Sequence, residues 1–343
     1  MGQQFASDNN AGMCPEALEA LIRENAAGHR TSYGGDEVTA AAAKVVQERF
    51  EADCSVHFVF NGTAANALGL AQISQPYHAV IAHAFSHIEW DEAGALGFFS
   101  GGASVLSADL PAAKLTVEAA GELATRFEGI HHVKARAISL TQATELGTVY
   151  SLDEIAAFGD LARRHGLKLH MDGARFANAA VTLDATPAEM TWRRGVDVLS
   201  FGGVKNGLGI GECLIFFDKA LAEDFGWRMK QAGQLNSKMR LATAPWLALL
   251  ANDVWLKNAR HANAMARRLA DGLLRLDGVE LMHPVQANGV FVHLPEDLQQ
   301  RLRDKGWEFY TFVPPTGCRL MCAWDTERET VDRLLADVRA AGG

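Results

Sequence analysis

The sequence predicts an α/β protein with a mostly parallel sheet between helices, followed by a smaller α+β domain. Short apolar runs alternate with helical patterns from about residue 56 to residue 217, which is typical of parallel strands joined by helices. Past residue 250 the pattern changes to a long helix, then strands and a shorter helix. We therefore expect a large domain of residues 1–250, including an amino-terminal loop, and a small domain of residues 251–343.

The composition limits the possible partners. The chain has 343 residues, of which 48% are hydrophobic and 21% charged, as expected for a globular enzyme with a large core. No basic run offsets the net charge of −9, so we expect no nucleic acid and no membrane as a partner. No apolar run reaches membrane-spanning length, and the first residues do not resemble a secretion signal.

The cysteines indicate a reducing compartment. There are five, an odd number without C-x-x-C spacing, so reduced thiols in the cytoplasm are the simplest interpretation.

The amino-terminal stretch is predicted to be a polar loop over residues 7–12 and, after Pro15, a helix over 16–26. The run from Thr31 to Asp36 contains Tyr33 and two glycines, which predicts a turn. Asp36 can cap the alanine-rich helix that follows to about residue 50. This pattern is equally consistent with an ordinary loop and cap.

A strand over 56–60 leads directly into Asn61, Gly62 and Thr63 at the start of a small-residue helix. Free N–H groups at a helix amino terminus, together with the helix dipole, bind phosphate well. A Gly-Thr pair is also a common helix start, so the motif gains weight only from its position.

The segment 79–94 contains His83 and His87. On a helix these side chains would face the same way and could bind a metal. The apolar run before them favours a strand and a turn instead, and no third ligand is evident, so no metal site is predicted. His87 stacked on a flat cofactor is the sharper alternative.

Further strand and helix patterns surround a carboxylate. A strand over 134–140, a polar loop over 141–149 and a helix over 152–165 precede a short buried strand that ends at Asp172, with Arg175 close behind. Parallel sheets collect ligand groups at the carboxyl ends of their strands. His87, Asp172 and Lys205 all lie at such strand ends.

Lys205 follows a buried strand and lies in a loop with five glycines. A desolvated lysine is a nucleophile that forms imines with carbonyl groups. Alone, the motif also fits an exposed turn lysine. A carboxylate on one strand followed by a lysine after the next is what pyridoxal phosphate requires, because the lysine binds its aldehyde and the carboxylate keeps its ring nitrogen protonated.

The carboxyl-terminal part is predicted as a strand over 214–217, a long helical region over 225–255 and a helix over 251–276. Strands over 290–294, 307–313 and 318–324 and a helix over 297–305 should follow, with Arg319 on a strand.

Together these motifs resemble the low-specificity L-threonine aldolases of the β-eliminating lyase family, which are fold-type I pyridoxal phosphate enzymes. The resemblance implies a seven-stranded sheet in the large domain and covers nearly the whole chain. Its motifs occur in order: Ser7-Asp8, Tyr33-Gly-Gly-Asp36, Asn61-Gly-Thr-Ala-Ala-Asn66, His87 with Glu92-Ala-Gly94, Met171-Asp-Gly-Ala-Arg175, Lys205-Asn-Gly-Leu-Gly and Arg319-Leu.

The resemblance also implies a role for each cofactor residue. Lys205 would form the imine with pyridoxal 5'-phosphate, Asp172 would bind the pyridine nitrogen, and His87 would stack on the ring. The other residues implied to bind the cofactor are Gly62, Thr63 and Arg175 in the same subunit, and Tyr33 and Lys238 across a subunit interface. A homodimer or homotetramer with shared active sites would follow.

The substrate groups come from the same resemblance. Ser7, Arg175 and Arg319 would bind the substrate carboxylate, a task that suits the two-pronged guanidinium group. Many relatives have a histidine in the loop after residue 140, and Thr144 stands there in this chain. The implied activity is cleavage of L-threonine, L-allo-threonine and related β-hydroxy-α-amino acids to glycine and an aldehyde.

Two alternatives remain open. The chain could be another pyridoxal phosphate lyase or an aminotransferase, because these enzymes share the cofactor residues. It could also be a cofactor-binding or assembly protein without turnover.

Overall fold

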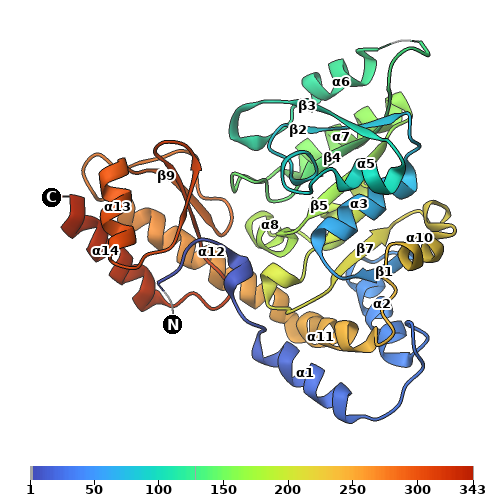
Figure 1. Ribbon diagram of the computed structural model, residues 1–343, viewed down its shortest axis with the longest axis horizontal. Helices are drawn as coiled ribbons and strands as arrows, with labels where there is room; N and C mark the ends of the chain where they lie inside the picture. The colour runs from blue at the N-terminus through green and yellow to red at the C-terminus, as the bar shows by residue number, and fades with distance from the viewer. Residues whose placement is uncertain (1–2, 128, 343) are drawn as a thin grey trace.

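The computed structural model describes residues 3–127 and 129–342, which form a larger and a smaller part joined by one long helix (Figure 1). The larger part contains the amino-terminal two-thirds of the chain. The smaller part, orange to red in the figure, contains the carboxyl-terminal strands and helices.

The larger part is built on a seven-stranded sheet with the order β1-β7-β6-β5-β4-β2-β3. The five strands from β3 to β6 pair in parallel, whereas β7 is antiparallel to both of its neighbours. The mostly parallel sheet predicted from the alternating pattern is thus confirmed. The strands are β1 Ser55–Val59, β2 His78–His83, β3 Ser104–Ala108, β4 Lys134–Thr141, β5 Lys168–Gly173, β6 Val198–Phe201 and β7 Glu212–Phe216.

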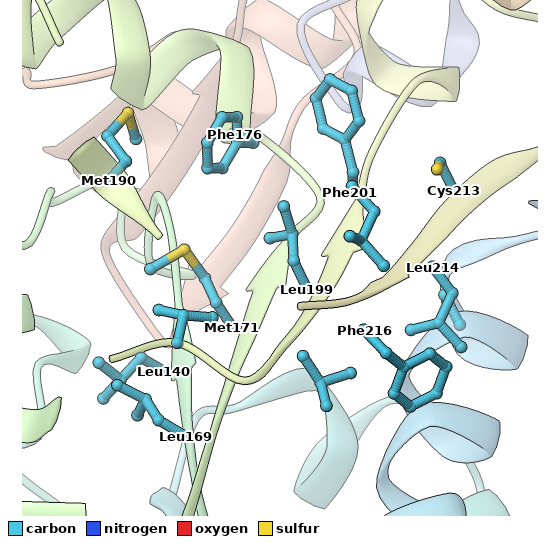
Figure 2. Packing of buried hydrophobic residues seen from close by; sticks show 14 of the residues in the cluster. Leu140, Leu169, Met171, Phe176, Met190, Leu199, Phe201, Cys213, Leu214 and Phe216 are labelled. Carbon is cyan, nitrogen blue, oxygen red and sulfur yellow. The ribbon is translucent and has the colours of Figure 1, made fainter. Parts of the chain in front are cut away.

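Both faces of the central strands are buried. Every residue of β2, β6 and β7 is buried, which explains their continuous apolar runs, because a strand between two helical layers has no polar face. Figure 2 shows Met171, Leu199 and Phe201 among the side chains of this core. Packing on both faces thus encloses these strands.

Two helices of the larger part have the caps that the sequence predicts. Asp36 caps α2 by accepting the N–H of Thr39 at 2.8 Å. Ser151 and Glu154 form a capping box at the start of α7, and Gly166 ends that helix in the left-handed conformation. The helices are α1 Pro15–Ala26, α2 Glu37–Arg49, α3 Gly62–Ile73, α4 His87–Trp90, α5 Ala95–Ser100, α6 Val117–Thr125, α7 Leu152–His165, α8 Phe176–Leu183, α9 Pro187–Met190, α10 Phe225–Gln231 and α11 Arg240–Leu250.

The single helical region predicted over 225–255 is wrong. The structure has α10, a turn containing Gly233, and then α11. A second break follows at Asn252 and Asp253, whose φ angles are +49° and +55°, so the next helix begins at Val254 rather than at residue 251. Left-handed residues cannot continue a right-handed helix, and apolar periodicity does not reveal them.

The smaller part is a four-stranded antiparallel sheet with the order β10-β11-β9-β8, packed on helices. Arg319 lies on β11, as predicted. The predicted strands over 307–313 and 318–324 are shorter in the structure. The elements are α12 Val254–Leu273, β8 Glu280–Leu281, β9 Gly289–His293, α13 Glu296–Asp304, β10 Tyr310–Val313, β11 Gly317–Met321 and α14 Arg328–Gly342.

Two connections tie the parts together. Helix α12 contributes Val254 and Trp255 to the core of the larger part, and Leu269 and Leu273 to that of the smaller part. The amino-terminal segment crosses over as well, because Phe5 is buried in the core of the smaller part. A domain boundary at residue 250 stays a prediction.

All five cysteines are buried, and none forms a disulfide in the part of the chain that the structure describes. Among the described helices, none combines the length and the apolar character needed to cross a bilayer.

Candidate active site

A cavity of ≈ 230 Å³ opens at the carboxyl ends of β5 and β6, beside the amino terminus of α3. Residues that follow several strands meet at this edge, as expected for ligand sites in parallel sheets. Five of the predicted site residues line the cavity, namely Gly62, Thr63, His87, Asp172 and Lys205.

Lys205 lies in a short 3-10 turn, Val204–Asn206, directly after β6. Two glycines allow the backbone to pass from β6 to Lys205. A Cβ on Gly202 would meet the backbone of Ala174, and one on Gly203 would meet the Trp246 ring. The described residues give the Lys205 amine no hydrogen-bond partner, so the amine is available to a ligand.

Asp172 lies near the carboxyl end of β5 and is fixed in position by two donors. Its Oδ1 accepts the N–H of Ala174 at 2.9 Å, and its Oδ2 accepts Nδ2 of Asn66 at 2.7 Å. The same Asn66 nitrogen donates to Oε1 of Glu92 at 2.9 Å. One amide group therefore holds two carboxylates in place.

His87 is the first residue of α4, and its ring is oriented by Glu92. Nδ1 of His87 lies 2.8 Å from Oε1 of Glu92, which leaves Nε2 as the nitrogen available to a ligand. This hydrogen bond raises the pKa of His87, although burial opposes it. The alternative of a His83–His87 metal pair is wrong, because His83 lies on β2 and its ring binds the backbone of Phe85 and Leu110.

The amino terminus of α3 fits an anion. Asn61 caps this helix by accepting the N–H of Ala64 at 2.9 Å. The N–H groups of Gly62 and Thr63 have no acceptor among the described residues, and both residues line the cavity. The phosphate site predicted here therefore has unused donors at the positive end of a helix dipole.

Arg175 and Arg319 lie close enough to influence each other, although one comes from the larger part and the other from the smaller part. Arg175 is already bound, because its Nε and Nη2 donate to Asp8 at 2.8 and 2.9 Å. The Nη2 of Arg319 donates to the carbonyl of Ala6 at 3.1 Å, and its buried Nε has no partner in the described chain. Burial and, after it, the neighbouring charge of Arg175 lower the pKa of Arg319 to about 10.

Ser7 precedes the 3-10 turn Asp8–Asn10, and its Oγ accepts the N–H of Asn9 at 3.1 Å. It adjoins the Asp8–Arg175 pair without lining the cavity. Asn9, which the sequence did not single out, does line it.

Tyr33 and Lys238 lie outside the cavity and beside each other. The N–H of Tyr33 donates to the carbonyl of Ser237 at 3.2 Å. Tyr33 is 49% exposed, and the amine of Lys230 lies over the face of its ring. Within this subunit neither side chain reaches the predicted phosphate site.

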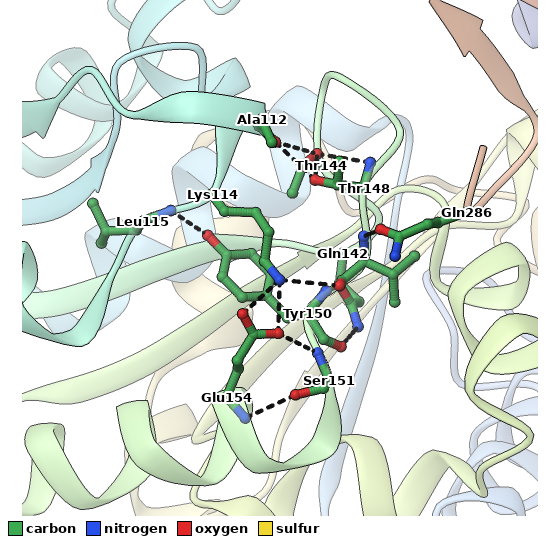
Figure 3. Close-up of polar contacts among 11 residues, drawn as sticks. Ala112, Lys114, Leu115, Gln142, Thr144, Thr148, Tyr150, Ser151, Glu154 and Gln286 are labelled. Carbon is green, nitrogen blue, oxygen red and sulfur yellow. Dashed lines mark hydrogen bonds and ion pairs between the residues drawn. The ribbon is translucent and has the colours of Figure 1, made fainter. Parts of the chain in front are cut away.

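Thr144 is buried and also lies outside the cavity lining. Its hydroxyl group is 2.7 Å from that of Thr148, and both hydroxyls reach the carbonyl of Ala112 (Figure 3). These contacts hold the loop after β4 against the segment around Ala112. The substrate contact predicted for Thr144 stays a prediction.

Two glutamates of the site, the buried Glu212 and the partly buried Glu145, were not predicted. Glu145 accepts the backbone N–H of His87 at 3.1 Å and the hydroxyl of Thr141 at 2.9 Å, and Glu212 lines the cavity. Burial raises the pKa of each carboxyl to about 7. No sequence signal marks either residue, whereas Asn66, Glu92 and Asp8 lie within the motifs quoted above.

The structure combines a mostly parallel sheet with a lysine just beyond one strand end and a carboxylate on the adjacent strand. The β-eliminating lyase family model matches residues 4–297, and the chain belongs to this family.

The most informative relatives share one name. Over 338 residues the chain is 51% identical to the low specificity L-threonine aldolase of Pseudomonas sp. (strain NCIMB 10558), covering 98% of this chain and 97% of that protein. It is also 51% identical to the low specificity L-threonine aldolase of Pseudomonas aeruginosa over 341 residues, or 99% and 98% of the two chains.

Solved structures are similar to this chain as well. Leishmania major threonine aldolase superposes with a TM-score of 0.93 at 30% identity, over 98% of each chain. Aspartate aminotransferase from Thermus thermophilus has a TM-score of 0.72 at 17% identity, over 98% of this chain and 91% of that one, which shows a shared fold alone. The fold predicted from the resemblance is confirmed.

Proposed function

We propose that the chain is a pyridoxal 5'-phosphate-dependent aldolase that cleaves L-threonine, L-allo-threonine and related β-hydroxy-α-amino acids to glycine and an aldehyde. The observation that carries the proposal is that Lys205, Asp172 and the α3 amino terminus line one cavity in a chain 51% identical to low specificity L-threonine aldolases. When bound, the cofactor supplies an electron sink that stabilises negative charge on the substrate Cα.

The residues present fit this cofactor. Lys205 has a free amine for the aldehyde, and Asp172 has a fixed carboxylate for the protonated ring nitrogen. Gly62 and Thr63 have unused donors for the phosphate, and the ring of His87 lies at the same cavity. We include Arg175 as a charge beside the cofactor, because it interacts with Asp172.

Arg319 is the stronger candidate for the substrate carboxylate. Arg175 is neutralised by Asp8, whereas Arg319 has no carboxylate partner in residues 3–127 and 129–342. A substrate carboxylate between the two guanidinium groups would relieve their mutual repulsion. Ser7 would add a hydroxyl donor from the adjoining turn.

The β-hydroxyl proton is assigned to His87. Glu92 binds Nδ1, so Nε2 can accept the proton while Cα–Cβ breaks, its electron pair remains on Cα, and Cβ becomes the aldehyde carbonyl. One proton must then be returned to Cα to release glycine. Thr144 would contact the β-hydroxyl only if it left Thr148.

A product assay tests the activity. Glycine and acetaldehyde formed from L-threonine without ammonia would support the aldolase over an eliminating lyase, and absence of amino-group transfer to a keto acid would exclude the aminotransferase. Borohydride reduction followed by peptide mapping should place the cofactor on Lys205. A label on another lysine, or no label, would refute the proposed site. Cofactor bound at Lys205 without cleavage of any β-hydroxy amino acid would instead support the alternative of a cofactor-binding protein without turnover.

We also propose a cytoplasmic homodimer or homotetramer. Tyr33 and Lys238 would reach the phosphate of a neighbouring subunit, since they lie outside the cavity of their own.

A further inference from the structure

Glu212 lies beside the predicted phosphate site and has no part in the chemistry described so far. It is the first residue of β7 and pairs with Val59 near the end of β1, just before the turn into α3. This register places Glu212 beside the strand that leads into Gly62 and Thr63, and all three residues line the same cavity. An acidic side chain is unexpected where a phosphate should bind.

The two oxygens of Glu212 have different surroundings. Oε2 accepts the backbone N–H of Gly203 in a short hydrogen bond and that of Val204 at 3.5 Å, so it fixes the loop before Lys205. Oε1 accepts no hydrogen bond from any residue that the structure describes. Unlike Oε2 of Glu92 or Glu145, it is not enclosed by protein. One oxygen is thus committed to the loop, and the other remains for a ligand.

The charges around Glu212 do not compensate a phosphate. Burial raises the pKa of Glu212 to about 7, with Lys205 lowering it and Asp172 raising it; the thiol of Cys213 follows in the chain. Lys205 is the cation among these groups, and its amine is needed by the cofactor aldehyde. A carboxylate and a phosphate side by side would repel each other strongly in a buried site, so one of them must hold a proton.

We propose that Glu212 binds the cofactor phosphate as the neutral acid, with Oε1–H donating a hydrogen bond to a phosphate oxygen while Oε2 keeps the N–H groups of Gly203 and Val204. The proposal rests on the cofactor assigned under the proposed function. The proton comes from solvent and bonds to Oε1, so no other bond is made or broken. Above neutral pH, cofactor binding should therefore take up a proton.

Calorimetry of the cofactor-free full-length protein tests this role. Pyridoxal 5'-phosphate is titrated at about pH 8 in buffers of different ionisation enthalpy, which gives the number of protons taken up. The wild-type chain should take up about one proton more than Glu212→Gln, whose amide imitates the neutral acid. Between about pH 7.5 and 8.5 the wild-type affinity should fall roughly tenfold more than that of the variant.

Two controls isolate the phosphate contact. Glu154→Gln removes a carboxyl group that pairs with Lys114 and does not line the cavity, so this variant should take up as many protons as the wild type. Pyridoxal, which lacks the phosphate, should show no difference between the wild type and Glu212→Gln.

Several outcomes would overturn the role. Equal proton counts for the wild type and Glu212→Gln, or tenfold weaker binding by the variant below neutral pH, would mean that Glu212 acts as an anion. If the variant does not fold, infrared difference spectra of the wild type give the answer, because cofactor binding must add the carbonyl band of a protonated carboxyl group. A wild-type chain that binds no cofactor would refute the proposed function as well, whereas binding with equal proton counts would refute this role alone.

Discussion

Asp172 is the carboxylate whose position is most firmly set. Asn66 and the N–H of Ala174 both donate to it, so the charge cannot turn away from the cavity. A fixed anion at this point is what a protonated pyridine nitrogen requires.

We expect Asp172→Asn to retain the cofactor but to lower kcat by roughly 10²-fold or more, because a neutral amide does not hold the pyridinium charge. Absorption spectra and threonine cleavage measure the two effects. Asp197→Asn is the matched control, since Asp197 accepts the N–H of Leu169 at the opposite end of the sheet and should leave kcat near the wild-type value. A kcat near the wild-type value in Asp172→Asn would contradict the assignment.

His87 combines two roles that one substitution separates. His87→Phe keeps an aromatic face for the cofactor but removes the titratable group, so cofactor affinity should survive while cleavage falls by roughly 10²-fold. The neutral ring is the base, so the cleavage rate of the wild type should rise with pH through the raised pKa of His87. This rise in the pH–rate profile should be absent in the variant.

Glu92→Gln is the control for this assignment. This variant keeps the His87 ring but weakens the interaction that raises the pKa of His87. The rise of the cleavage rate with pH should therefore move to lower pH. If His87→Phe cleaves threonine at the wild-type rate with an unchanged pH profile, His87 only stacks and a water or Lys205 takes the proton.

At this scale the sequence predicts residues in distinctive local settings. Lys205 among glycines and Asp172 at a strand end could be predicted as site residues, because the residues around them in the sequence are distinctive. Glu145 and Glu212 could not, since a glutamate near a strand is usually solvated and only the folded chain encloses these two. The pairing of Arg175 with Asp8 was missed for the same reason, as 167 residues separate them.

At the scale of elements, close packing sets the position of the catalytic strands. Helix α7 approaches the loop before β6 so closely that Gly159 has no room for a side chain, and its Cβ would overlap the carbonyl of Arg194. Because β6 leads directly to Lys205, this contact supports the site from a distance. The helix itself was predicted from its caps, but the contact depends on how the helix packs.

We therefore expect Gly159→Ala to lower the free energy of unfolding by about 1–3 kcal/mol, because backbone atoms cannot move aside cheaply. Gly121→Ala in α6 is the matched control, since its Cβ would meet Leu161 at an ordinary 3.5 Å. That variant should be neutral or up to about 1 kcal/mol more stable, as alanine favours helix. Denaturant unfolding measures both, and equal stabilities would contradict the packing argument.

At the scale of the whole molecule, the substrate groups come from segments far apart in the chain. Arg319 lies on the smaller sheet, Arg175 follows β5 of the larger one, and Ser7 and Asp8 belong to the segment that crosses between them. The sequence predicted both sheets but not this crossing, because Phe5 alone does not show which core receives it. A change in the angle between the two parts would alter the distance between the guanidinium groups.

The surface around Tyr33 is where the proposed second subunit would bind. Tyr33 is 49% exposed, Phe60 is 60% exposed and Ile210 is 37% exposed. Phe60 directly precedes Asn61 at the cavity, and it lines a second cavity of ≈ 370 Å³ together with Ile210 and Met239. Apolar surface of this kind beside an active site is typical of a subunit interface.

Mixing inactive variants tests whether subunits share active sites. Lys205→Ala lacks the cofactor lysine of its own site, and Lys238→Ala lacks the group proposed to reach the neighbouring site. A mixed dimer would contain one intact site of its two. After equal mixing and full exchange, half of the dimers are mixed, so roughly a quarter of the wild-type activity should return.

Lys205→Ala mixed with Asp172→Asn is the control, because both substitutions affect the subunit's own site and no activity should return. If verified exchange restores nothing in the first mixture either, Lys238 acts within its own subunit or not at all, and the shared-site assembly is refuted.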